Sequence, residues 1–356
     1  MLHQRAGRSE SDRVCRGAGS APVEKLQRHS AVKPMIVDLI RRKPLTTFYV
    51  LAFVLGAFVT GLRLLDPSAM GMLFKDMRTN PWHPNVISVF PYVLERPILW
   101  TGYLFPFAPT AAALIIVALG WGRQGLGDLF DRMRFWRNGV QWREGALVYA
   151  AMAAVYLASV TWLLLVLISR EPDSGLAGML ARYGQTPLAI ISFMVLALFL
   201  GPGGLLEELG WRGFMFPLLV KRLSSPLMAC VVLGVLWGLW HFPREIPSIL
   251  SGNPAMLKGG SWIGFLLNQI QFVAGTIVAS ILIAFVFFRT GGSVWAAILA
   301  HNISNEFSVG LTLFTKSSVQ FLGMTMDVDT PIKVALAIII VVCTGPRLGL
   351  KPDAEP

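Results

Sequence analysis

Residues 205–242 read LLEELGWRGFMFPLLVKRLSSPLMACVVLGVLWGLWHF, two apolar runs joined by a charged turn at residues 221–226. Glu207 lies 17 residues before Ser224, and His241 lies 17 residues after it. An antiparallel pair of helices folded at that serine would bring the carboxylate and the imidazole to one level, about 25 Å from the turn at about 1.5 Å per residue. Ionisable side chains so deep in an apolar segment are costly, which makes them candidates for function.

The composition indicates a polytopic membrane protein. Of the 356 residues, 54% are hydrophobic and only 14% are charged, which is more apolar side chain than a soluble surface of this size could hide. Three scattered cysteines, Cys15, Cys230 and Cys343, form no metal-binding spacing, so neither a disulfide framework nor a thiolate zinc site is predicted. The net charge of +11 is concentrated near the N-terminus and beside apolar runs, which favours lipid headgroups over nucleic acid as the partner.

The hydrophobic pattern predicts an all-α fold, a transmembrane helix bundle of about eight spans with one interfacial amphipathic helix. Apolar residues between 126 and 136 share one helical face opposite three arginines, which predicts that amphipathic helix. The fourth span is too long for one straight crossing, and we expect a kink at the Gly-Pro-Gly-Gly sequence of residues 201–204. The expected spans are 45–65, 98–119, 146–168, 188–222, 226–242, 262–288, 293–314 and 331–343.

Polar residues recur at a spacing of four in three of the expected helices, and that spacing places two side chains on one helical face. His301 and Asn305 lie about 13 to 20 Å into the seventh span, a depth compatible with the level expected for Glu207 and His241. The sequence therefore predicts that these four polar residues, from three helices, meet in one chamber. The three patterns are Glu207-Glu208-x-x-x-Arg212, Trp237-x-x-x-His241 and His301-x-x-x-Asn305.

The stretches EELGWR, WGLWH and HNISN resemble the three motifs of the CPBP family of intramembrane proteases, which includes the CAAX prenyl endopeptidases and the bacteriocin-processing Abi proteins. The family patterns are EExxxR, FxxxH and HxxxN or a close variant. The resemblance covers roughly residues 188–314, with the motifs in order. Trp237 replaces the usual Phe, a change expected to alter the packing beside His241 and to leave the chemistry intact.

The resemblance implies an intramembrane endopeptidase that hydrolyses a peptide bond. In this interpretation Glu207 and His241 activate a water molecule for attack on the peptide carbonyl. His301 and Asn305 would stabilise the oxyanion, because hydrogen-bond donors act where negative charge develops. A peptide or membrane-protein substrate is implied, lipidated substrates included, in a membrane of the bacterial plasma-membrane type.

Two further residues of the first motif, Glu208 and Arg212, are expected to pair in support of the site, because a buried guanidinium needs a counter-ion. With eight spans both termini lie on one side of the membrane. Lys and Arg are more numerous on that side, which predicts cytoplasmic termini. The expected parts of the chain are a disordered basic tail (1–44), N-terminal membrane helices with the amphipathic helix (45–185), a catalytic helical core of the CPBP/Abi type (186–315), and a last membrane helix with the C-terminal tail (316–356).

A metal-dependent mechanism is one alternative that the sequence leaves open. Glu207, His241 and His301 could bind a divalent ion such as zinc, with a water molecule in an open coordination position. The HExxH signature that would indicate a zinc protease strongly is absent from the chain. The favoured interpretation therefore has no cofactor, and the metal site is the competing one.

A protein without proteolytic activity is the other alternative, either a transporter or a scaffold or immunity protein of the same fold. Broken helices and buried acids also occur in transporters. Against a transporter, the two halves of the chain show no obvious repeat. The residues that follow Pro243, Arg244 and Glu245, are expected to lie in a solvated loop.

Overall fold

The structure of this chain is a computed structural model. It describes residues 35–66, 87, 90–137, 139–170, 187–250, 252–253, 256–315, 318–321, 324–327 and 329–350. The basic tail expected to be disordered (1–34) and most of the long loop expected after the first span lie outside the described residues.

The long helices follow the expected spans to within a few residues, apart from the fourth span, which is broken, and α5, which runs past the expected end at residue 119 to Asp131. They are α2 (Pro44–Leu62), α5 (Thr101–Asp131), α6 (Trp142–Arg170), α11 (Pro226–Trp240), α13 (Trp262–Arg289), α14 (Val294–Thr315) and α15 (Asp329–Thr344). The fourth span consists of α8 (Pro187–Leu200), α9 (Pro202–Glu208), a π-helical segment (Leu209–Met215) and α10 (Phe216–Leu223). Short elements are α4 (Phe90–Glu95), α12 (Ile246–Leu250) and four-residue 3-10 turns at Pro97–Trp100 and Phe242–Glu245.

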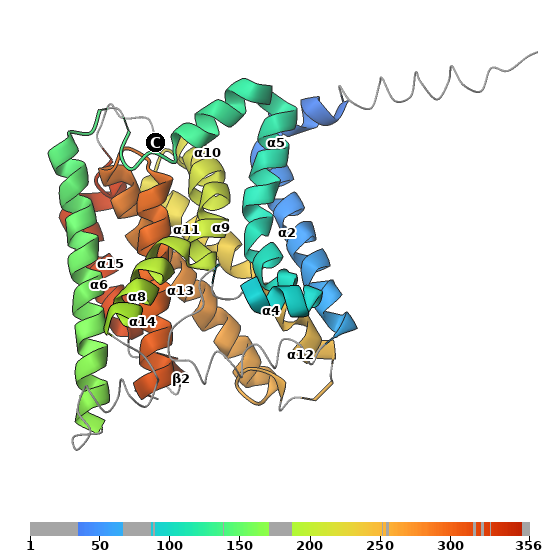
Figure 1. The fold of residues 1–356 in the computed structure, drawn as a ribbon. Helices are drawn as coiled ribbons and strands as arrows, with labels where there is room; N and C mark the ends of the chain where they lie inside the picture. Colours follow the sequence, from blue (N-terminus) through green and yellow to red (C-terminus); the bar gives the residue numbers. More distant parts are fainter. Residues whose placement is uncertain are drawn as a thin grey trace, which may run out of the picture.

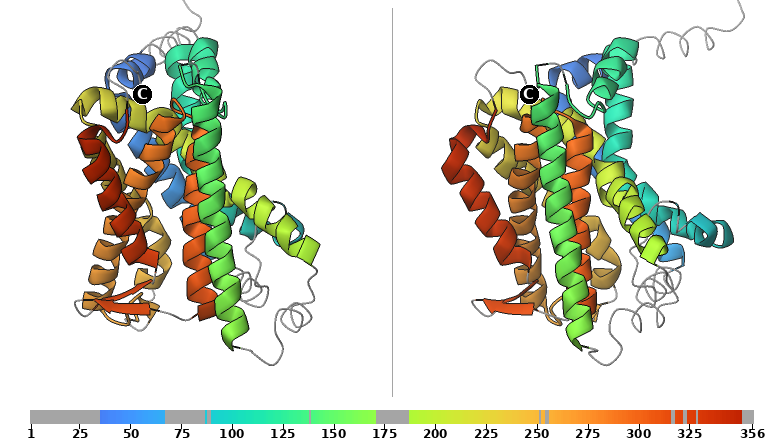
Figure 2. Two further views of the ribbon diagram at one scale, coloured as in Figure 1. Left: turned by 90° about the vertical axis from the view of Figure 1, so that its left-hand side faces the viewer. Right: turned by 60° about the vertical axis from the view of Figure 1, so that its left-hand side comes forward.

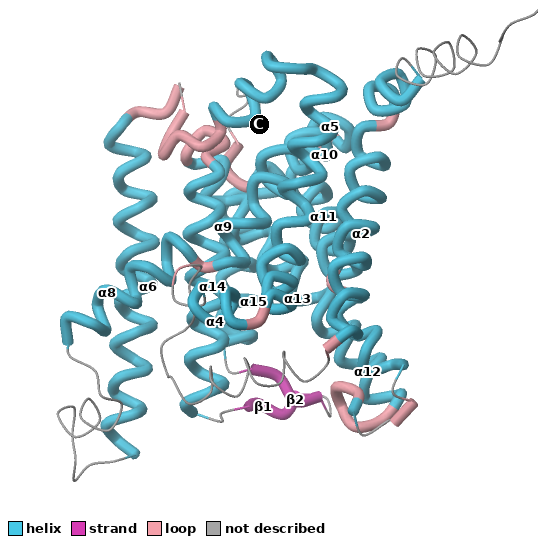
Figure 3. Tube along the Cα trace, turned by 45° about the vertical axis from the view of Figure 1, so that its right-hand side comes forward, coloured by secondary structure: helices cyan, strands magenta, loops and turns pink. Residues whose placement is uncertain are grey.

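One short antiparallel hairpin, which the sequence interpretation did not include, follows α14. Its strands β1 (Ser318–Phe321) and β2 (Met324–Asp327) pair Ser318 with Asp327. The hairpin lies at one end of the bundle, at the same end as α12 (Figure 3). The start of α2 and the end of α15 lie at the opposite end of the bundle (Figures 1 and 2).

Six segments of the described chain are long and apolar enough to cross a membrane, and this chain is an integral membrane protein. The broken fourth span and α14 are not among the six, so the expected count of eight stays a prediction. Rows of exposed apolar side chains, such as Ile338, Ile339 and Val342 of α15, fit contact with lipid tails. The six are Pro44–Leu65, Pro97–Asp131, Trp142–Thr161, Pro226–Leu250, Trp262–Arg289 and Thr330–Arg347.

The bundle has two flanks around a central group of helices. Helices α2 and α5 pack side by side on one flank, and α6 runs along α14 on the other (Figures 1 and 2). Between them α11 packs along α13, while α9 packs against both α5 and α14. The largest apolar core joins α2, α5, the π-helical segment, α10, α11, α13 and α14. The broken fourth span is therefore held in the middle of the protein.

The helical hairpin predicted at Ser224 is confirmed. Ser224 ends α10 in the left-handed conformation, with φ of 51°. Ser225 then caps the next helix, because its Oγ accepts a hydrogen bond from the Met228 N–H at 3.3 Å. Pro226 occupies the first turn of α11, where no backbone donor is needed. These local signals explain why the chain reverses at this position.

The kink predicted at residues 201–204 is confirmed, and a second irregularity follows it. Gly201 is extended (φ −60°, ψ 125°) and Pro202 starts α9. After Glu208 the helix widens into the π-helical segment, whose Gly210 lies against α5. A Cβ on Gly210 would come within 2.4 Å of the Pro109 carbonyl carbon, so only glycine allows this approach. Wide turns of this kind are frequent at functional sites.

Of the amphipathic helix predicted around residues 126–136, only the part up to Asp131 is helical, and it forms the bent end of α5. Gly122 has φ of 64° and ψ of −149°, and this non-helical residue turns the chain across the end of the bundle (Figure 1). Leu129 faces the core, whereas Phe130 is 51% exposed. These two apolar residues therefore differ in burial, and the exposed Phe130 is available for contact with the membrane interface.

Candidate active site

The broken fourth span places two acids and a guanidinium in the interior of the bundle. Glu207 and Glu208 end α9, and Arg212 lies in the π-helical segment. Glu207 is 5% exposed, Glu208 0% and Arg212 1%. His241 at the end of α11 and His301 in α14 are also buried, at 8% and 4%. Five ionisable residues therefore lie in the apolar core, where each needs a partner.

Trp237 connects the acid of the first motif to the histidine of the second. Its indole Nε1–H donates to Glu207 Oε2 at 2.8 Å, and its backbone oxygen lies 2.8 Å from His241 Nδ1. A backbone carbonyl only accepts, so the proton of His241 lies on Nδ1. In the neutral ring Nε2 is then an acceptor, able to take a proton from water.

Glu208 connects the first motif to the third through a single oxygen. Its Oε1 accepts from Arg212 at 2.8 Å and lies 2.6 Å from His301 Nδ1. The expected pairing of Glu208 with Arg212 is therefore present, and His301 is an additional partner. Arg212 also donates to Ser280 Oγ at 3.2 Å and lies with its Cζ 4.6 Å from the centre of the Trp237 ring. This network joins α9, α11, α13 and α14.

His301 and Asn305 lie together over Gly203 in the first turn of α9. A Cβ on Gly203 would be 2.8 Å from Asn305 Nδ2 and 3.1 Å from His301 Nε2. Two nitrogens thus lie within about 3 Å of one point beside the α9 backbone. Asn305 differs from the other members in being exposed. The glycine therefore provides the space next to both nitrogens.

The structure gathers three of the four expected residues, Glu207, His241 and His301, around the indole of Trp237. Its ring centre lies 5.9 Å from that of His241 and 5.1 Å from that of His301, and its N–H binds Glu207. Glu207 and His241 are joined through Trp237, and no direct hydrogen bond links them among the contacts of the described residues. The expectation that Trp237 contributes only packing is wrong, because a phenylalanine could not make the bond to Glu207.

The alternative metal site at Glu207, His241 and His301 does not have the geometry of a three-ligand centre. Within the described part of the chain, no three or more His, Cys, Asp or Glu side chains are grouped so that they could hold a metal ion. The Trp237 indole contacts both imidazoles and binds the carboxylate. As placed, the three residues do not fit a shared ion.

Asn302 is a buried residue of this region that the sequence interpretation missed. Its Oδ1 accepts from the Gly204 N–H at 2.9 Å, and its Nδ2 donates to the Leu198 carbonyl at 2.8 Å. The first N–H groups and last C=O groups of a helix lack partners within the helix. Asn302 satisfies one of each across the break between α8 and α9. The sequence could have indicated this residue, because an asparagine next to His301 within an apolar span is a costly polar group.

The expectation that Arg244 and Glu245 lie in a solvated loop is wrong. Glu245 is 6% exposed and accepts from Lys258 Nζ at 2.7 Å. Arg244 lies with its Cζ 5.3 Å from the centre of the Phe272 ring, and the same ring lies 5.0 Å from the ring of His241. The chain does not leave the protein after His241, because the turn at Phe242–Glu245 packs against α2 and α11. Arg244 brings a cation close to His241.

Comparisons with known proteins identify the same region. Residues 185–307 match the family model described as type II CAAX prenyl endopeptidase Rce1-like. A protein of Methanococcus maripaludis, named CAAX prenyl protease 2, is 30% identical over 99 residues. That alignment covers 28% of this chain and 34% of the relative, so the chain matches about a third of that protein's length. No solved structure shows significant similarity to the chain.

The matched segment contains the whole of the broken span, the α10–α11 hairpin and the part of α14 that carries His301 and Asn305. The residues that the sequence patterns selected therefore all lie inside it. Over residues 185–307, about a third of its length, this chain is therefore similar to the Rce1-like type II CAAX prenyl endopeptidases.

Proposed function

We propose that this chain is an intramembrane endopeptidase that hydrolyses a peptide bond with a water molecule activated by Glu207 and His241. The observation that carries the proposal is the two-way contact of Trp237, which holds Glu207 by its side chain and His241 by its carbonyl. Two proton acceptors are thereby oriented by one residue. The family match over residues 185–307 supports the same activity.

In the proposed reaction, water attacks the peptide carbonyl and gives up a proton to the Glu207 and His241 pair. Trp237 occupies Glu207 Oε2, which leaves the other carboxylate oxygen for the water. The proton is then passed to the leaving amine, as general acid–base catalysis requires. The bond between the carbonyl carbon and the amide nitrogen breaks in this second step.

The oxyanion of the tetrahedral intermediate would be bound beside Gly203 by Asn305 Nδ2 and His301 Nε2. Both nitrogens approach the same point there. His301 Nδ1 faces Glu208, so as an imidazolium the ring donates from both nitrogens, to Glu208 and to the oxyanion. Arg212 balances the charge of Glu208. Glu208 and Arg212 thus act as positioning residues for His301.

The proposed substrate is a peptide or the tail of a membrane protein, and the name of the archaeal relative makes a prenylated C-terminal peptide the first to test. The purified full-length protein in detergent would be given a peptide that carries a farnesylated cysteine three residues before its end, and the same peptide without the farnesyl group. Products would be identified by mass spectrometry. Glu207→Gln and His241→Ala should each lower the cleavage rate by about a thousandfold or more, in line with the loss of an acid–base group.

A comparison of the peptides present in whole membranes tests for substrates that are not prenylated. Peptides from membranes of cells that express the wild-type chain would be compared with those from cells that express Glu207→Gln. The proposal requires at least one cleavage product that depends on Glu207. If no product depends on it, the chain is a transporter or scaffold of the same fold. If both variants cleave at the wild-type rate, Glu207 and His241 do not activate the water. Repeating the wild-type reaction with a chelator separates the metal-dependent alternative, which predicts a loss of cleavage.

A further inference from the structure

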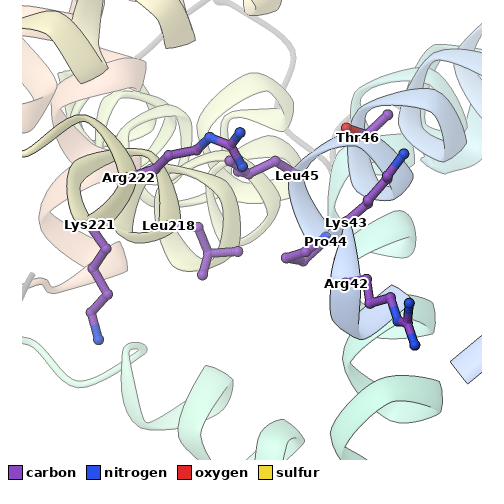
Figure 4. Close-up of a pocket in the computed structure, with 8 residues that line it drawn as sticks. All are labelled: Arg42, Lys43, Pro44, Leu45, Thr46, Leu218, Lys221 and Arg222. Atoms are coloured by element: carbon purple, nitrogen blue, oxygen red, sulfur yellow. The ribbon is translucent and has the colours of Figure 1, made fainter. Parts of the chain in front are cut away.

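A basic pocket lies between the start of α2 and the end of α10, far from the residues discussed above. It has a volume of about 590 Å³ and is lined by Arg42, Lys43, Pro44, Leu45, Thr46, Leu218, Lys221 and Arg222. Figure 4 shows the Arg222 side chain extending from α10 towards Leu45 at the start of α2. Lys221 lies 14 residues after Glu207, so the pocket is about 20 Å along the helix from that acid.

The pocket is strongly cationic. Four of its eight residues are Lys or Arg, and none of the eight is acidic. Arg42 also pairs with Asp38 at 2.9 Å, but both side chains are exposed and Asp38 does not line the cavity. Like charges gathered from two helices repel each other unless an anion lies between them. The pocket is therefore suited to an anionic ligand.

The surroundings place this pocket at the boundary between lipid and water. The helix at residues 35–42 precedes it, and Met35, Ile36 and Leu39 are 66%, 42% and 52% exposed. Arg41 of the same helix donates to the Gly120 carbonyl at 2.7 Å, which ties the helix to α5. Exposed apolar residues followed by a run of basic ones are typical of a segment that lies in the membrane interface.

An apolar track leads from the pocket along the outer face of α2. Val50, Val54 and Phe58 are 54%, 55% and 64% exposed, and they follow Thr46 of the pocket at steps of four residues. This spacing keeps them on one side of the helix. A headgroup in the pocket would thus have its acyl chains beside exposed hydrophobic side chains. A free inorganic anion would make no use of this track.

We propose that the pocket binds the anionic headgroup of a phospholipid, whose phosphate lies between Lys43 and Arg222 while its acyl chains follow α2. Basic pockets between membrane helices bind anionic lipid headgroups in this manner. The occupant would join α2 to α10. Since α10 continues directly into the segment that carries Arg212, the bound lipid would brace one end of the broken span.

The experiment measures lipid binding by the purified full-length protein, by native mass spectrometry and by thermal stabilisation in detergent. The probes are short-chain phosphatidylglycerol, short-chain phosphatidylcholine and inorganic phosphate. The test variant is Lys43→Gln/Arg222→Gln. The control variant, Arg123→Gln/Arg143→Gln, removes two exposed arginines near the same end of the bundle and outside the pocket (Figure 1).

The wild-type chain and the control should bind phosphatidylglycerol at least tenfold more tightly than phosphatidylcholine. The pocket variant should bind phosphatidylglycerol about thirtyfold more weakly than the wild type, since each of the two basic residues contributes about 1 kcal/mol, or about a fivefold step. Equal losses in the two variants would overturn the proposal in favour of general surface charge.

The wild-type protein alone also decides the matter if the pocket variant does not fold. Equal binding of the two lipids would mean that the pocket does not select an anion. Full displacement of phosphatidylglycerol by millimolar phosphate would mean that the ligand is a free phosphate and that the acyl track is not used. Either result would refute a phospholipid site.

Discussion

The indole N–H of Trp237 donates to Glu207 Oε2 over 2.8 Å in the interior of the bundle. The family pattern has phenylalanine at this position, which cannot make the bond. In this chain the second motif therefore positions the acid of the first motif directly. The same tryptophan lies under the Arg212 guanidinium and against His301. One substitution of the usual residue thus changes how the site is held together.

The variant Trp237→Phe should keep the packed ring and lose the hydrogen bond. A bond to a charged group contributes about 1.5–3 kcal/mol, and its loss leaves a buried carboxylate oxygen without that donor. We expect the free energy of unfolding in mixed micelles to fall by about that amount, and kcat/KM to fall about ten- to hundredfold. The control is Trp211→Phe, because Trp211 is fully buried and its Nε1 has no hydrogen-bond partner within the described residues. Equal effects of the two variants would show that the Trp237 bond has no special role.

Gly203 is expected to be intolerant of even one added methyl group. In Gly203→Ala the new Cβ would lie 2.8 Å from Asn305 Nδ2 and 3.1 Å from His301 Nε2. It would displace the donors proposed for the oxyanion, and loss of one such donor costs about 10²–10³ in kcat. The measurement is the rate of peptide cleavage at saturating substrate.

The matched control for Gly203 is Gly275→Ala in α13, where an added Cβ meets nothing within 4 Å. This control should cleave at the wild-type rate and be slightly more stable, since alanine is favoured over glycine within a helix. A Gly203→Ala enzyme with normal kcat would remove the oxyanion site from the mechanism.

Arg212 is expected to be essential for stability because Glu208 is fully buried beside it. Removing one partner of a buried pair costs about 3–5 kcal/mol. Arg212→Gln should therefore lower the midpoint of thermal unfolding strongly. The control, Arg134→Gln, breaks a surface pair with Asp131, in which the side chains of Arg134 and Asp131 are 61% and 33% exposed. Such an exposed pair contributes about 0–1 kcal/mol. Similar shifts in the two variants would contradict a buried counter-ion role.

Asn302 is expected to hold α8 and α9 together at the break. Asn302→Leu leaves the Gly204 N–H and the Leu198 carbonyl without their partner, and each such group costs about 1–3 kcal/mol. Asn302→Asp keeps an acceptor for Gly204 and loses the donor to Leu198, so its free energy of unfolding should lie between those of wild type and Asn302→Leu. Hydrogen exchange of the Gly204 amide provides a local readout. Unchanged protection in Asn302→Leu would contradict the assignment.

The membrane character, the approximate helix bounds and the reversal at Ser224 follow from the sequence by itself. Long apolar runs specify helices in lipid, because the backbone must satisfy its hydrogen bonds within the segment. The kink at residues 201–204 was also predictable, since a proline and three glycines disfavour a continuous helix. The polar residues stood out for the same reason, as costly groups in apolar helices.

Only the tertiary structure decided which partner each polar residue takes. Trp237 looked like a packing residue, and Asn302 lies off the face shared by His301 and Asn305, so neither role follows from helical spacing. The π-helical segment depends on Gly210 packing against Pro109, a contact between residues about 100 positions apart. Arg244 and Glu245 resemble loop residues in the sequence, but the turn that carries them packs against α2 and α11. Spacing determines which side chains share a helix face, whereas hydrogen-bond partners on other helices depend on how the whole bundle packs.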